Sequence, residues 1–111
     1  MLARALVLAA LVLGSAACAP PSSAGPRQTV DGVLLDVVSP SLQQVTSFTL
    51  RADDGRELAF VTAPEFNQGV AHVMTPGHMR QHMALAEPIR VTYRDDAGKL
   101  VALSAVDAAS S

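Results

Sequence analysis

The residues best suited to chemistry in this chain gather in one short stretch, HVMTPGHMRQHM, which spans residues 72–83. Its candidate ligands are His72, Met74, His78, Met79, His82 and Met83. His78 and His82 are four residues apart, so in a helix their rings lie on one face and can reach the same metal ion. His72 and Met74 precede them and can fold back as third and fourth ligands. Imidazole combined with thioether favours copper, especially Cu(I), over zinc.

The same residues also have a purely structural explanation. Met79 and Met83 fall on the helix stripe that should face a core, where methionine fills gaps. A histidine pair at helical spacing is often part of a solvated face, or one ring is buried with its nitrogens hydrogen-bonded. We find no carboxylate or cysteine that adds to the cluster. Copper or zinc bound by His72, Met74, His78 and His82 is therefore the alternative to a domain without a cofactor.

The lone cysteine, Cys18, ends a segment that has the pattern of an export signal, MLARALVLAALVLGSAAC. One positive charge, Arg4, precedes an apolar run and a group of small residues. The apolar run is too short for a transmembrane helix, which needs about 20 apolar residues. Residues 14–18 resemble the lipobox of bacterial lipoproteins, although Ser15 stands where leucine is commonest. The resemblance implies that residues 1–17 are cleaved off and that the Cys18 thiol is acylated, which anchors the protein in a membrane.

The rest of the chain divides into a linker, one domain and a tail. Residues 18–28 are rich in Pro, Ser, Ala and Gly and predict a flexible tether. Residues 29–107 are enough for one small domain, and residues 108–111 predict a disordered tail. With one cysteine, no intramolecular disulfide can form, so the domain must depend on its apolar core.

Composition and motifs exclude several function classes. The net charge is −2, which disfavours binding to nucleic acid because that binding relies on clustered positive charge. The chain has no G-x-S-x-G, H-E-x-x-H or Gly-rich phosphate motif, so we expect no enzymatic activity. The aspartate pairs at 53–54 and 95–96 have the composition of hairpin turns.

Alternating and β-branched segments predict five strands, at residues 30–38, 45–51, 56–62, 89–94 and 99–106. Gly32 marks a bulge or bend in the first and longest of them. Thr75 and Pro76 predict the start of a helix that runs to about Leu85, and Pro88 prevents its extension.

Three strands, a helix and two further strands follow one another in this prediction. That order resembles the OB-fold, a five-stranded Greek-key barrel with a helix between strands 3 and 4. We therefore expect a mainly β, five-stranded antiparallel OB-like barrel whose helix plugs one end. An open antiparallel sheet with one helix packed on it is the alternative.

These predictions together favour a non-enzymatic binding or scaffolding module. We expect a lipid-anchored envelope protein on the periplasmic or extracellular side of the cell membrane or outer membrane. Its partner would be an envelope protein, a polysaccharide or a small ligand. The second hypothesis is a lipoprotein that binds copper or zinc through the helix histidines.

Overall fold

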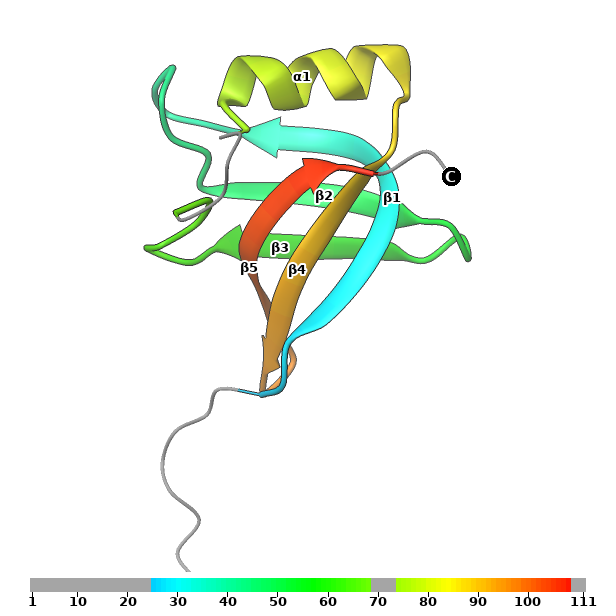
Figure 1. Ribbon diagram of the computed structural model, residues 1–111, viewed down its shortest axis with the longest axis vertical. Helices are drawn as coiled ribbons and strands as arrows, with labels where there is room; N and C mark the ends of the chain where they lie inside the picture. The colour runs from blue at the N-terminus through cyan, green and yellow to red at the C-terminus, as the bar shows by residue number, and fades with distance from the viewer. Residues whose placement is uncertain (1–24, 69–73, 109–111) are drawn as a thin grey trace, which may run out of the picture.

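A closed five-stranded barrel with one helix forms the domain, as the computed structural model shows for residues 25–68 and 74–108 (Figure 1). Its elements are β1 (Gln28–Val38), β2 (Ser47–Ala52), β3 (Glu57–Thr62), α1 (Pro76–Leu85), β4 (Ile89–Asp96) and β5 (Lys99–Asp107). The strands follow one another around the barrel in the order β1-β2-β3-β5-β4. The predicted OB-like barrel with its helix between strands 3 and 4 is confirmed, and the open sheet is excluded.

One strand pair differs from the antiparallel barrel that the sequence predicts. Strands β3 and β5 are parallel, with Phe60 opposite Leu100 and Thr62 opposite Ala102. The other four pairs around the barrel are antiparallel. The chain runs from β3 through α1 and β4 before it reaches β5, and such a long crossover is what a parallel pair requires. Alternation within single strands carries no information on this pairing.

Strand β1 is long and contributes to both sides of the barrel, because it pairs with β4 through its first half and with β2 through its second. Its bulge lies between Leu34 and Asp36, where the register with β2 shifts, and not at the predicted Gly32. Gly32 serves a different purpose. A Cβ there would lie 2.3 Å from the Arg51 carbonyl oxygen, so only glycine allows β1 and β2 to approach this closely.

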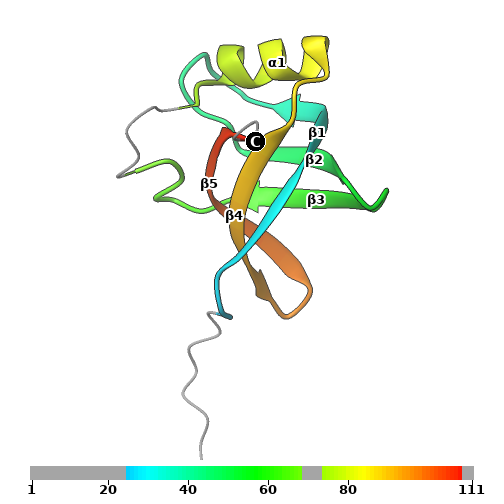
Figure 2. The ribbon, with the colours of Figure 1, turned by 45° about the vertical axis from the view of Figure 1, so that its right-hand side comes forward.

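The core is built from the inward-facing residues of the alternating strands. Phe48 and Phe60 stack with ring centroids 5.1 Å apart, and Tyr93 meets Phe60 edge-on at 5.2 Å. Met79, from the helix, is fully buried in the same cluster. The helix thereby closes one end of the barrel, as Figure 2 shows from a second side.

The aspartate pairs act as turn residues, as the sequence predicts. Asp54 Oδ1 accepts a hydrogen bond of 3.0 Å from the Arg56 N–H. Asp95 Oδ1 accepts one of 2.7 Å from the Gly98 N–H. These short-range bonds are typical of Asx turns and account for Asp54 and Asp95 without a metal site.

Several predictions fall outside the described residues. They concern the signal peptide at 1–17, Cys18, most of the linker, His72 and the tail from residue 109. Strand β1 begins at Gln28, the last residue assigned to the linker from sequence. Among the described residues, no helix has both the length and the apolar character to cross a membrane.

Candidate metal centre

Helix α1 begins as its sequence predicts. The Thr75 side chain accepts a hydrogen bond of 3.2 Å from the His78 N–H, and Pro76 occupies the first turn, where no N–H partner is needed. His78 therefore lies in a capped first turn, and its backbone is fixed at the point where the ring leaves the helix.

The end of α1 positions the second histidine. Ala86 adopts the left-handed conformation, with φ of 53°. The Ala86 N–H then donates to the Met83 carbonyl at 3.2 Å, and the Glu87 N–H donates to the His82 carbonyl at 2.9 Å. This pattern is a Schellman motif, in which the chain folds back over the last turn.

That turn brings the Glu87 carbonyl oxygen within 3.2 Å of His82 Nδ1. A carbonyl oxygen can only accept, so the contact requires a proton on Nδ1. In the neutral ring the lone pair then resides on Nε2, which faces away from Glu87. The His82 side chain is only 7% exposed, so the ring is held in this orientation.

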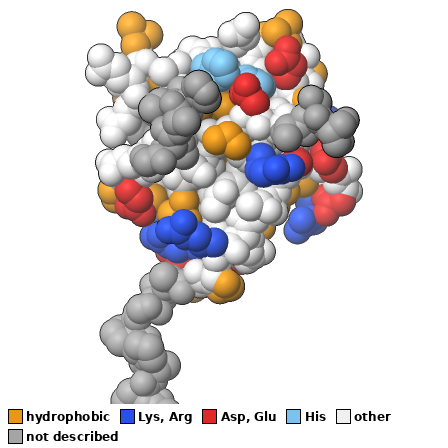
Figure 3. All heavy atoms as spheres, in the orientation of Figure 1, with side chains coloured by type: hydrophobic (Ala, Val, Ile, Leu, Met, Phe, Trp, Pro, Cys, Tyr) orange, Lys and Arg blue, Asp and Glu red, His pale blue; other side chains and the backbone are white. Residues whose placement is uncertain are grey.

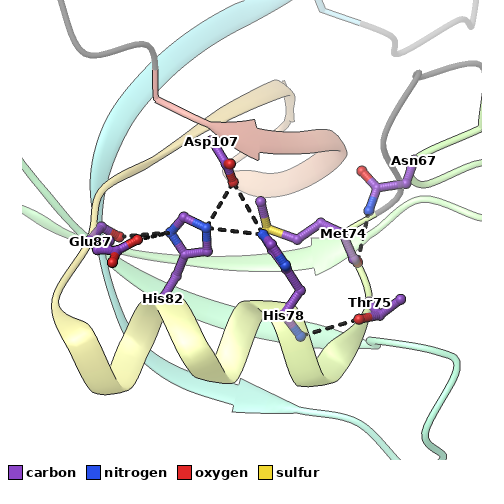
Figure 4. A network of polar contacts seen from close by, with 7 residues as sticks. All are labelled: Asn67, Met74, Thr75, His78, His82, Glu87 and Asp107. Atoms are coloured by element: carbon purple, nitrogen blue, oxygen red, sulfur yellow. Dashed lines mark hydrogen bonds and ion pairs between the residues drawn. The ribbon is translucent and has the colours of Figure 1, made fainter.

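His78, His82 and Asp107 bring three ligand atoms together at the end of the barrel that α1 covers (Figure 4). His82 Nε2 lies 2.8 Å from Asp107 Oδ1 and 3.2 Å from His78 Nε2. His78 Nε2 lies 3.3 Å from the same carboxylate oxygen. Two residues come from α1 and the third from the last residue of β5.

The three distances suit a metal ion. In a tetrahedral site with metal–nitrogen bonds of about 2.0–2.1 Å, neighbouring ligand atoms are about 3.3 Å apart. The observed triangle has sides of 2.8, 3.2 and 3.3 Å. Each corner is an atom that can carry a lone pair, and such atoms attract one another only through a shared cation, either a proton or a metal ion.

The charge of Asp107 also favours a bound cation. The hydrogen bond from His78 lowers the pKa of Asp107, against a smaller opposing effect of burial, and the charges of the two histidines lower it further. Asp107 is therefore ionised at neutral pH. Its negative charge faces the two imidazole rings and favours a cation between them, which is a proton on a ring nitrogen in the metal-free protein.

Solvent reaches the cluster from one side. The side chains of His78 and Asp107 are 45% and 66% exposed, whereas His82 lies beneath them. In Figure 3 the histidine atoms (pale blue) appear beside an acidic side chain (red) on the helix end of the surface. An ion can enter directly, and three protein ligands would leave a coordination position open to solvent.

The other two ligands predicted from sequence, Met74 and His72, are not part of this triangle of ligand atoms as the structure describes it. Met74 is buried in the core cluster, 4% exposed, and in the view of Figure 4 its side chain extends toward the His78 ring. His72 lies outside the described residues. Of the four ligands predicted from sequence, the structure therefore brings His78 and His82 together.

Asp107 is the residue that sequence reasoning missed, and its presence corrects the expectation that no carboxylate adds to the cluster. It lies 29 residues from His78. Only the closure of the barrel brings the end of β5 to the helix. His82 is the buried, hydrogen-bonded ring that the structural explanation from sequence allows. The sequence also predicts Ala86 on the core stripe with Met79 and Met83, but Ala86 is exposed because the helix has ended and the chain turns back there.

Comparisons with known proteins give one similarity, in fold. No protein-family model matches the chain, and no curated protein matches its sequence. The structure is similar to that of apo-CusF (residues 6–88) from Escherichia coli, with a TM-score of 0.52 and 7% sequence identity. The match covers 85% of this chain and 100% of the CusF chain. At this identity the similarity shows a shared CusF-like, OB-like barrel fold.

Proposed function

We propose that this domain is a non-enzymatic module that binds one divalent transition-metal ion through His78, His82 and Asp107. The observation that carries the proposal is the convergence of three ligand atoms, 2.8–3.3 Å apart, from two elements distant in sequence. The hydrogen bond from His82 Nδ1 to the Glu87 carbonyl supports it. Metal-binding histidines almost always donate their second nitrogen in this way.

The ligand set favours Cu(II) or Zn(II). Imidazole suits both ions, while a carboxylate is a harder ligand than the thioethers that favour Cu(I). The expectation of Cu(I) from sequence rested on methionine, and Asp107 shifts the preference toward the divalent ions. By the general order of affinities for divalent ions, Cu(II) should bind more tightly than Zn(II).

The structural similarity gives limited support to a binding role. The CusF structure is described as an apo form, a term for a protein without its ligand. The shared barrel is therefore compatible with ligand binding, and the residues proposed here are argued from this chain alone.

Export and anchoring belong to the same proposal. The lipobox-like segment supports a mature protein that begins at an acylated Cys18 and faces the periplasm or the exterior. Mass spectrometry of the mature N-terminus tests this: diacylglycerol on Cys18 is expected, and an unmodified thiol would refute the anchor. An envelope protein, polysaccharide or small ligand as a partner also stays a proposal.

Metal titration tests the main proposal. The protein beginning at residue 18, with Cys18→Ser and no histidine tag, is titrated with Cu(II) and Zn(II) by calorimetry. We expect one ion per chain, and a loss of at least about tenfold in affinity for His78→Ala, His82→Ala and Asp107→Asn. His72→Ala and Met74→Leu examine the two ligands predicted from sequence alone.

Glu87→Gln is the matched carboxylate control, because its side chain lies 3.8 Å from the Nδ1 side of His82 and away from the ligand triangle. It should leave the affinity close to that of the parent protein. Absence of micromolar binding, or binding that the His78, His82 and Asp107 variants do not weaken, would overturn the proposal.

A further inference from the structure

Asn67 lies in the irregular segment between β3 and α1, and it is unusual for a polar residue because it is buried. It is only 5% exposed, and its φ of 64° places it in the left-handed region. Both ends of its side-chain amide are used. Nδ2 donates to the Met74 carbonyl at 3.2 Å, and Oδ1 accepts from the Ala105 N–H at 2.9 Å.

The first of these bonds holds the start of the helix. Met74 directly precedes the N-cap Thr75, whose side chain accepts from the His78 N–H. Fixing the Met74 carbonyl therefore fixes the turn from which His78 extends. Figure 4 shows this sequence of contacts from Asn67 through Met74 and Thr75 to His78.

The second bond holds the end of β5. Strand β5 pairs with β3 only as far as Ala102, so the edge of its second half lacks a strand partner in β3. The segment after β3 covers that edge: the Asn67 N–H donates to the Leu103 carbonyl at 3.0 Å, and Oδ1 accepts from Ala105. Ala105 is two residues before Asp107.

We infer that Asn67 is a positioning residue for the metal centre, because one buried amide fixes both the helix turn that carries His78 and the strand end that carries Asp107. The inference rests on the proposed function. It explains why His78 Nε2 and Asp107 Oδ1 lie 3.3 Å apart although both side chains are exposed. Residues that orient ligands in this way typically contribute 10–100-fold to metal affinity.

Two substitutions test the role of the Asn67 side-chain amide apart from that of its left-handed backbone conformation. Asn67→Gly keeps the left-handed conformation accessible but removes both side-chain hydrogen bonds. Asn67→Asp keeps the acceptor for the Ala105 N–H and replaces the donor to the Met74 carbonyl by a second acceptor. Both should weaken Cu(II) binding about 10–100-fold with the stoichiometry unchanged.

Leu100→Ala is the matched control for lost stability, because Leu100 packs against the core at the start of β5, opposite Asp95 beside the β4–β5 turn. It should destabilise the fold yet keep the parent affinity. Equal affinity in the parent protein and Asn67→Gly, or an equal loss in Leu100→Ala, would overturn the inference.

A second measurement needs no metal. Long-range ¹H–¹⁵N spectra of the histidine rings report the His78–Asp107 contact in the metal-free protein. In Asn67→Gly the His78 ring signals should move, while the protonated His82 Nδ1 should persist because Glu87 still accepts from it. Unchanged His78 signals would refute the positioning role. Failure of the parent protein to bind metal, with these spectra as expected, would refute only the proposed function.

Discussion

His82 Nε2 lies 2.8 Å from Asp107 Oδ1, which joins the last turn of α1 to the last residue of β5. This contact connects the helix that closes the barrel with the strand that completes it. It makes the candidate metal centre part of the tertiary structure, so ion binding and folding should depend on each other.

The two helix histidines should differ in their effect on the metal-free fold. His82 is buried, and its two ring nitrogens contact the Glu87 carbonyl and the Asp107 carboxylate, so His82→Ala should lower the free energy of unfolding by about 2 kcal/mol. His78 is 45% exposed, and His78→Ala should change the free energy by no more than about 0.5 kcal/mol. Urea unfolding monitored by circular dichroism measures both. Equal losses would contradict the assigned burial.

Metal should stabilise the folded protein by mass action. At a free ion concentration of 100 times Kd, the gain in unfolding free energy should be about 2.7 kcal/mol, and a chelator should remove it. Thermal unfolding with and without Zn(II) measures this gain. Asp107→Asn should lose most of it, whereas a gain retained in that variant would mean that the ion binds elsewhere.

The fold itself was largely predictable from local patterns. Alternation identified the strands that carry Phe48 and Val91, and the Thr75–Pro76 pair located the start of the helix. The parallel β3–β5 pair, the bulge after Leu34 and the approach of Asp107 to His82 were not predictable. Each depends on how distant segments meet once the barrel closes, and no periodicity within a segment encodes that.

The Asp31–Arg90 ion pair should make stability depend on pH. Arg90 donates to both Asp31 oxygens, at 2.8 and 2.9 Å, and this hydrogen bonding lowers the pKa of Asp31 below 3.8. A carboxylate with a lowered pKa stabilises the fold above 3.8, and this contribution is lost as the pH falls through the lowered pKa. Asp31→Asn should therefore lose stability at neutral pH and show a weaker dependence at acid pH. Urea unfolding of the parent protein and of Asp31→Asn, at neutral and at acid pH, checks this. An identical dependence of stability on pH in the two proteins would contradict it.

The helix C-terminus offers a stabilising substitution. Ala86 is left-handed, a conformation that glycine adopts without a Cβ penalty, so Ala86→Gly should raise the unfolding free energy by about 1 kcal/mol. Ala84→Gly, inside the helix, is the control and should lower it by about 1 kcal/mol. Thermal or urea unfolding distinguishes the two. A loss in both variants would argue against the Schellman turn that orients His82.

Two glycines should respond in opposite ways to alanine. Gly32→Ala should cost about 3 kcal/mol or more, because the new Cβ meets the backbone of Arg51 and Ala52. At Gly77 nothing lies within 4 Å of the added Cβ, so Gly77→Ala should be neutral or stabilising. Expression level and unfolding free energy report the difference. Tolerance of alanine at residue 32 would contradict the close β1–β2 approach.

The chain enters the barrel at the start of β1, which we call the entry pole, and the position of this pole determines where a lipid anchor would lie relative to the metal centre. Strand β1 starts at the pole opposite α1, as Figures 1 and 2 both show. A lipid on Cys18 would therefore attach the domain through its entry pole, and His78 and Asp107 would lie at the pole farther from the point of attachment. Ions, or a docking protein, would then approach the ligands from the aqueous side without displacing the membrane.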